Sequence, residues 1–114
     1  MALQYNLAKV YEISHNDFQF AQQIVTLFIE EIPAEIKIIK DAIEDKDYEI
    51  TYSSSHKIKP TLDLLGMDLA YEENIEIMNW AKAKGKRKEI KEVFKSLKDR
   101  IDLTVKEIKK DFKL

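Results

Sequence analysis

Apolar residues recur at every third or fourth position along most of the chain, and this spacing constrains the fold more than any other feature. The longest row consists of Phe18, Ala21, Val25, Phe28, Ile32, Ile36, Ile39 and Ile43. Residues with this period line one face of an α-helix. The chain has only two Gly and two Pro among 114 residues, too few for the many turns of a β-rich fold. The sequence therefore predicts an all-α protein.

The first long helix is expected to begin at a cap provided by Asn16 or Asp17. Pro33 interrupts its apolar row, and in a regular helix the proline ring clashes with the carbonyl group of Ile29. We therefore expect either a kink or a break between two collinear helices. A second apolar row beside the first consists of Phe20, Ile24, Leu27 and Ile38. This extra width predicts additional core, covered by the N-terminal segment, or a surface on which a partner docks.

Three further helices are expected after the first. They cover about residues 47–65, 71–84 and 90–112, with Gly66 ending the first of them, a loop over 67–70, and Gly85 ending the second. The predicted architecture is an up-down-up-down four-helix bundle with short connections. A short N-terminal helical or irregular segment over 5–13 precedes it. The length suits a single domain over residues 1–114.

The charge and composition of the chain exclude several classes of protein. Lys and Arg number 19 against 21 Asp and Glu, and the net charge of -2 gives no general attraction to nucleic acid or acidic membranes. No stretch approaches the roughly 20 apolar residues that a membrane-spanning helix needs, and the N-terminus has no signal-peptide pattern. The absence of Cys excludes disulfides, thiolate metal sites and thiol catalysis. We expect a cytoplasmic protein.

His56 is the leading candidate for chemistry near neutral pH, because the chain has only two histidines and no cysteine. Imidazole is the side chain whose ordinary pKa, about 6.5, lies closest to neutrality. The helix around His56 is expected to bury Thr51, Ser54, Ser55, Ile58, Leu62 and Leu65 on the opposite face. Its exposed face is expected to consist of Glu49, Tyr52, Ser53, Lys59, Pro60 and Asp63. His56 should therefore point into solvent, whereas His15, near a helix start, is expected to be structural.

The neighbours of His56 allow both a functional and a purely structural interpretation. Lys59, one helical turn away, either favours a phosphoryl group on the imidazole or is a solvated lysine loosely paired with Asp63. Pro60 clashes with the carbonyl group of His56, and it either simply kinks the helix or also leaves a low surface for a docking partner. The small side chains of the serine run 53–55 let a neighbouring helix approach closely, or they serve the imidazole directly.

The run from His56 to Gly66 resembles the motif of histidine-containing phosphotransfer (HPt) domains, roughly H-x-L-K-G-S-x-x-x-L-G. The matching positions are His56, Ile58, Lys59, Thr61, Leu65 and Gly66. The spacing of Phe28 and Pro33 in the preceding helix, the chain length and the number of helices are also similar to that family. The resemblance therefore covers nearly the whole chain. Pro60 departs from the pattern, because most members carry glycine there, and proline stiffens and kinks the backbone.

The resemblance implies a phosphorelay intermediate without ATP-dependent kinase activity of its own. Such domains accept a phosphoryl group on the histidine from a receiver-domain aspartyl phosphate and pass it to another receiver, with a hybrid sensor histidine kinase as a further partner. The chain shows no phosphate-binding loop or kinase signature. The resemblance assigns Mg²⁺ to the receiver, so no cofactor or metal is expected here. His56 is then the acceptor, and Lys59 stabilises phosphate charge. The expected receiver contacts are Glu49, Tyr52, Ser53, Pro60 and Asp63.

Two other functions are compatible with the sequence. A non-catalytic docking module with the HPt fold would use the apolar surface around Phe20, Ile24 and Leu27. Nucleic-acid binding would use the basic cluster Lys82, Lys84, Lys86, Arg87 and Lys88. Acidic residues elsewhere balance this cluster, so a solvated loop is the preferred interpretation. A metal site at His56 is disfavoured, because no partner histidine lies at helical spacing. We expect a monomer that binds receivers rather than nucleic acid or membranes.

Overall fold

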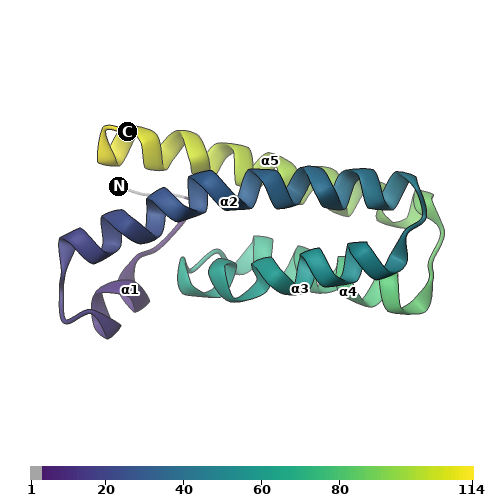
Figure 1. Cartoon of the computed structure of the whole chain (residues 1–114), viewed down its shortest axis with the longest axis horizontal. Coiled ribbons are helices and arrows are strands. Elements are labelled where there is room, and N and C mark those ends of the chain that lie inside the picture. The colour runs from purple at the N-terminus through teal and green to yellow at the C-terminus, as the bar shows by residue number, and fades with distance from the viewer. Residues whose placement is uncertain (1–3) are drawn as a thin grey trace.

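Five α-helices make up most of the chain in a computed structural model that describes residues 4–114 (Figure 1). They are α1 (Ala8–Ile13), α2 (Phe18–Glu44), α3 (Tyr48–Leu64), α4 (Asp68–Ala83) and α5 (Arg87–Phe112). No strand occurs in the described residues. The all-α prediction is therefore confirmed.

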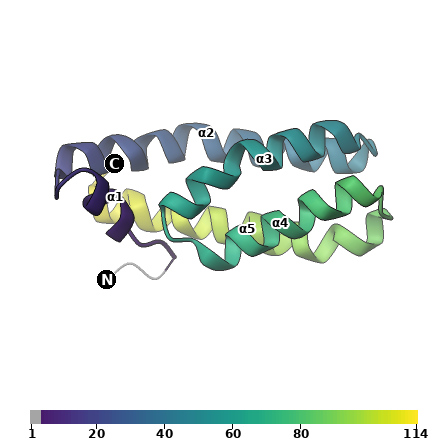
Figure 2. The ribbon, with the colours of Figure 1, turned by 90° about the horizontal axis from the view of Figure 1, so that it is seen from below.

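The four longer helices lie alongside one another and enclose an apolar core. Figure 1 shows α2 and α5 above α3 and α4, and Figure 2, from below, shows α3 and α4 in front of them. α2 and α4 each pack against both α3 and α5, and the short α1 packs against α2. The fully buried side chains include Phe28, Ile39, Ile58, Leu62, Leu65, Ile77, Leu97, Ile101 and Ile108. Their removal from water is the main term that favours this packing.

α2 starts at a predicted cap and continues through its proline. The Asp17 side chain accepts a hydrogen bond from the backbone N–H of Phe20 at 3.2 Å, which satisfies a free donor of the helix start. The helix is unbroken over 27 residues with Pro33 inside it, so the alternative of two separate helices is wrong. Figure 1 shows the first turns of α2 inclined to the rest, as a proline kink predicts. Phe18, although part of the apolar row, is 56% exposed and stacks on Phe112.

The connection between α3 and α4 is shorter than predicted. α4 already begins at Asp68, so the expected loop over 67–70 is wrong beyond its first residue. Gly66 permits this short connection, because its φ of +62° is a left-handed conformation that reverses the chain direction within a few residues. Met67 and Ala70 are buried in the core. Their burial favours a packed helix start over a solvated loop.

The turn between α4 and α5 uses a lysine in the position expected for glycine. α4 ends at Ala83, and Lys84 takes the left-handed conformation with a φ of 51°. The predicted helix end at Gly85 is therefore one residue late. Gly85 is needed for space instead, because a Cβ there would lie 2.3 Å from Cδ1 of Trp80. The Trp80 ring occupies that space and donates a hydrogen bond to the carbonyl group of Lys86 at 2.9 Å.

The N-terminal segment, predicted as helical or irregular, is partly both, because irregular residues lead into α1. Tyr5 is buried and donates a hydrogen bond to Asp111 of α5 at 2.7 Å. The backbone N–H of Asn6 bonds to the carbonyl group of Leu65 at 2.7 Å. Residues 1–3, part of the stretch in which no signal peptide was expected, lie outside the described residues. In the described part of the chain, no helix combines the length and apolar character needed to cross a membrane.

Candidate functional site

His56 lies near the middle of α3 and is exposed to solvent, as predicted. All six residues expected on the opposite face are buried: Thr51, Ser54, Ser55, Ile58, Leu62 and Leu65. Their burial determines the rotation of α3 about its axis, because turning the helix would bring apolar side chains into water. The imidazole is therefore held on the outer side of α3, where another molecule can reach it.

The other residues predicted around His56 also lie on the outer side of α3. Glu49, Ser53, Pro60 and Asp63 are exposed, and Tyr52 and Lys59 are half-buried. Because all of them belong to one helix, they form an outward-facing surface rather than an enclosed cavity. Such a surface suits contact with another protein better than capture of a small molecule, which usually needs a concave site.

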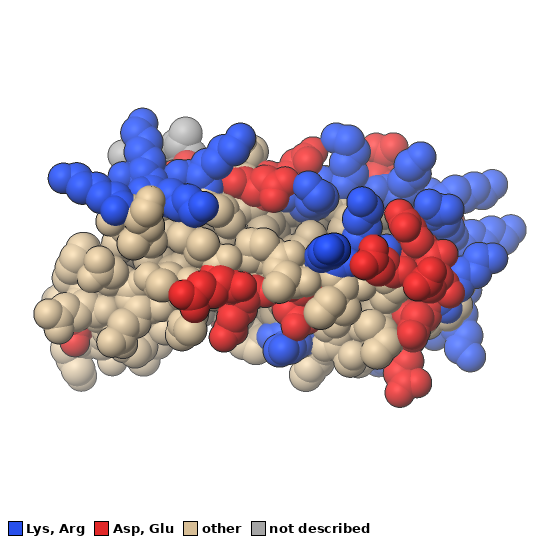
Figure 3. All heavy atoms as spheres, turned by 45° about the horizontal axis from the view of Figure 1, so that its top comes forward, with Lys and Arg blue, Asp and Glu red and all other residues tan. Residues whose placement is uncertain are grey.

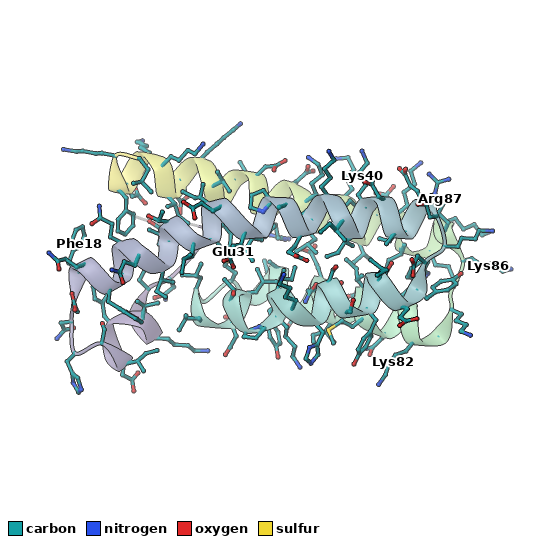
Figure 4. All side chains as sticks on the ribbon, viewed as in Figure 1. Phe18, Glu31, Lys40, Lys82, Lys86 and Arg87 are labelled. Atoms are coloured by element: carbon teal, nitrogen blue, oxygen red, sulfur yellow. The ribbon has the colours of Figure 1, made fainter. Side chains whose placement is uncertain are left out.

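Tyr52 packs directly against His56. The two rings lie at 20° to each other with their centroids 6.1 Å apart, as their four-residue spacing on one helix face allows. Lys82 on α4 holds its Nζ atom 5.7 Å from the centroid of the Tyr52 ring, within range of cation–π attraction. Figure 4 shows Lys82 pointing downward, away from α2. Lys82 thus places a positive charge over Tyr52, on the side chain that stacks on His56.

Sequence reasoning missed Lys82 as a site residue and placed it in the basic cluster of the α4–α5 turn. No local spacing relates it to Tyr52, and only the packing of α3 against α4 brings the two together. The other cluster members Lys84, Lys86, Arg87 and Lys88 are exposed. Arg87 approaches Glu44 of α2 at 3.9 Å. Figure 3 shows basic and acidic side chains intermixed at this end of the molecule.

Lys59 makes no ion pair within the described part of the chain. Asp63 pairs instead with Lys9 of α1 at 2.8 Å, so the suggested pairing of Lys59 with Asp63 is wrong. The neighbouring Lys57 contacts Glu35 of α2 at 3.0 Å, and this hydrogen bond raises the pKa of Lys57. Of the two lysines beside His56 in sequence, Lys59 is therefore the one left for an incoming anion.

The backbone around His56 is held partly by another helix. Pro60 lies inside α3 and has no N–H for the carbonyl group of His56. Figure 2 shows the C-terminal half of α3 turning away from the line of α2. The carbonyl group of Ser55 accepts a hydrogen bond from Nδ2 of Asn74 on α4 at 2.8 Å. Ser54 and Ser55 are buried, which supports the prediction that small residues here admit a neighbouring helix.

The second apolar row of α2 is only partly covered. Phe20 and Ile24 are half-buried against the core, whereas Leu27 is 47% and Ile38 43% exposed. A pocket of about 100 Å³ between α2 and α3 is lined by Ile24, Leu27, Phe28, Glu31, Ile32, Thr61 and Leu64. The row therefore supplies some extra core and also leaves an apolar surface beside the helix that carries His56.

Comparisons of the chain with family models, curated proteins and solved structures found no match. Among the described residues, no three His, Cys, Asp or Glu side chains gather closely enough to hold a metal ion. An exposed imidazole nitrogen can accept a phosphoryl group, and Lys59, one helical turn away, can neutralise part of its charge.

Proposed function

We propose that this chain is a histidine phosphotransfer (HPt) protein, a phosphorelay intermediate with His56 as the phosphoryl acceptor. It takes the phosphoryl group from an aspartyl phosphate of one receiver domain and passes it to another receiver. The observation that carries the proposal is the exposed position of His56 on α3, with Lys59 one turn away and free of ion pairs in the described residues. In this proposal the four longer helices form an up-down-up-down bundle.

Transfer to His56 exchanges one bond to phosphorus for another. A ring nitrogen of neutral imidazole attacks phosphorus with its lone pair, and the P–O bond to the receiver aspartate breaks. The carboxylate leaves with the bonding electrons, and the other ring nitrogen keeps its proton. In the return step, a carboxylate oxygen of the second receiver attacks and the N–P bond breaks. Both steps need in-line approach, which an exposed imidazole permits, and charge neutralisation, which Lys59 supplies.

The proposed partners are receiver domains and a hybrid sensor histidine kinase. They contact the outer face of α3 through Glu49, Tyr52, Ser53, Pro60 and Asp63. The Tyr52 ring, stacked on the imidazole, also limits the orientations that His56 can take. In this proposal the chain is a cytoplasmic monomer that carries phosphate and has no ATP-dependent kinase activity.

Phosphate transfer from a receiver tests the acceptor assignment. The full chain is incubated with a phosphorylated receiver, and acid-labile phosphate on the chain is measured. His56→Gln should abolish labelling and keep the helical circular dichroism spectrum, because His56 is exposed. His15→Gln is the matched control, since His15 is the other histidine and is also exposed, and it should label as the wild type does. Labelling that survives His56→Gln would show that the assignment is wrong.

The second candidate function is a non-catalytic docking module with the same fold. It is favoured by the exposed Leu27 and by the apolar pocket between α2 and α3. This candidate predicts that receivers bind equally well to wild type and His56→Gln, that Leu27→Glu weakens binding, and that no phosphate is transferred. Transfer to wild-type His56 would reject it.

A further inference from the structure

The turn of α3 that carries His56 is weakly held by the helix itself. Pro60 lies inside α3 and offers no N–H to the carbonyl group of His56. A proline also bends the helix, and Figure 2 shows α3 bending in its C-terminal half. Contacts from outside α3 therefore have more influence on the backbone here than in an uninterrupted helix.

Asn74 supplies such a contact from α4. Its Nδ2 atom donates a hydrogen bond to the carbonyl group of Ser55, the residue directly before His56, at 2.8 Å. Asn74 is 0% exposed, so neighbouring side chains hold it in place. The bond ties the backbone of the acceptor turn to the helix that also carries Lys82.

The presence of Asn74 at this buried position is not explained by a contribution to the stability of the fold. In the described structure, Oδ1 of Asn74 and Oγ of Ser55 are buried and have no hydrogen-bond partner. An unpaired buried polar atom costs about 1–3 kcal/mol, whereas an apolar residue of similar shape avoids the cost. The Ser55 carbonyl would keep a donor without Asn74, because the helical pattern pairs it with the N–H of Lys59. An apolar residue at position 74 would therefore leave the fold at least as stable.

We propose that Asn74 is a positioning residue of the phosphoryl-acceptor site. It holds the backbone of α3 through the Ser55 carbonyl, so that the His56 imidazole stays stacked on Tyr52 and in line for transfer. Asn74 itself touches neither the imidazole nor the phosphoryl group in this role. The inference rests on the proposed function of His56. Because transfer depends on alignment, a displacement of the turn by about 1 Å is enough to slow it by tenfold or more.

The test replaces Asn74 by leucine in the full chain and uses Thr104→Val as the matched control. Thr104 is also polar and 0% exposed, but it lies on α5, and its hydroxyl donates to the carbonyl group of Arg100 in the same helix. Three quantities are measured for each variant. They are the free energy of unfolding in urea, the rate at which phosphoramidate phosphorylates His56 with release of ammonia, and the NMR shifts of the His56 ring protons.

We expect Asn74→Leu to be at least as stable as the wild type, yet to be phosphorylated about tenfold more slowly or worse. Its His56 ring protons should also shift, because their resonances depend on the position of the Tyr52 ring. Thr104→Val should leave both the rate and the resonances unchanged. If leucine prevents folding, Asn74→Ala is measured in the same way, and the same criteria are applied to its phosphorylation rate and its His56 resonances.

Three negative results are distinguishable. If wild-type His56 is phosphorylated and the Asn74 variant keeps the same rate and resonances, the positioning role is wrong and the acceptor assignment stands. A slower rate that follows a loss of stability, with unmoved His56 resonances, also rejects the positioning role. If wild-type His56 takes no phosphate from phosphoramidate or from phosphorylated receivers, the proposed function fails and this inference fails with it.

Discussion

Replacing Gly66 by alanine is expected to destabilise the protein, because two separate costs arise at this position. Gly66 has a φ of +62°, and this left-handed conformation costs a residue with a side chain about 1–2 kcal/mol. A Cβ atom at position 66 would also lie 2.8 Å from Cβ and 3.0 Å from the carbonyl oxygen of Asn6. Both distances are too short for ordinary van der Waals contact, so Asn6 must move.

Movement of Asn6 breaks the hydrogen bond that holds the N-terminal segment against the α3–α4 connection. Its backbone N–H donates to the carbonyl group of Leu65 at 2.7 Å, and the loss of such a bond costs about 1 kcal/mol. Together with the left-handed conformation of Gly66, the free energy of unfolding should fall by about 2–3 kcal/mol. With a urea m-value of about 1–3 kcal/mol/M, the unfolding midpoint should fall by roughly 1 M.

Urea titrations followed by the fluorescence of Trp80, the single tryptophan, measure this change. Lys84→Gly is the matched control, because Lys84 is also left-handed, with a φ of 51°, but is exposed at the end of α4. Glycine there removes the conformational cost, so the midpoint should rise. An unchanged midpoint in Gly66→Ala would refute the steric and conformational account. If the unfolding midpoint falls in Lys84→Gly as well as in Gly66→Ala, the assumed cost of the left-handed conformation is wrong in sign at Lys84.

Two tyrosine substitutions test contacts elsewhere in the fold. Tyr5→Phe removes the hydrogen bond to Asp111 and should cost about 1–2 kcal/mol. Burial, followed by the hydrogen bond to Asp111, raises the pKa of Tyr5 above its ordinary value of 10.0. The folded state thus favours neutral Tyr5, and this stabilisation is complete below about pH 10 and lost as pH rises further. The free energy of unfolding, plotted against pH, should therefore fall more steeply above pH 10 in the wild type than in Tyr5→Phe. Parallel plots would contradict this. Tyr48→Phe removes the hydrogen bond to the carbonyl group of Gly85 at 2.8 Å and should lower the free energy of unfolding by about 1 kcal/mol in urea; an unchanged value would show that this bond contributes nothing net.

The existence and approximate position of the long helices could be predicted because helical periodicity is a local property of the chain. Asp17 caps α2 for the same reason, since its side chain needs only the N–H of a residue three positions later. The predictions failed where packing decided the outcome. α4 begins before Tyr71 because Met67 and Ala70 gain burial in the core. Phe18 continues the apolar row of α2 but lies at the end of the molecule (Figure 4), where less of the core is available to cover it.

The orientation of His56 could likewise be predicted from the sequence. The angular step of about 100° per residue relates each position of α3 to the buried face, and the prediction needed no knowledge of what covers that face. The partners of the surrounding residues could not be predicted in this way. Asp63 pairs with Lys9 rather than Lys59, because α1 packs nearby and brings a second lysine within reach.

The sequence by itself thus determined that the protein is helical, where its long helices run, and that His56 faces solvent beside Lys59. Each of these properties follows from spacing within one helix. Only the tertiary structure decided that Lys82 lies over Tyr52 and that Asn74 reaches the Ser55 carbonyl. Contacts between helices depend on the faces that pack together and on the relative shift of the helices along their axes. The sum of all core contacts sets both, and no spacing within a single helix records them.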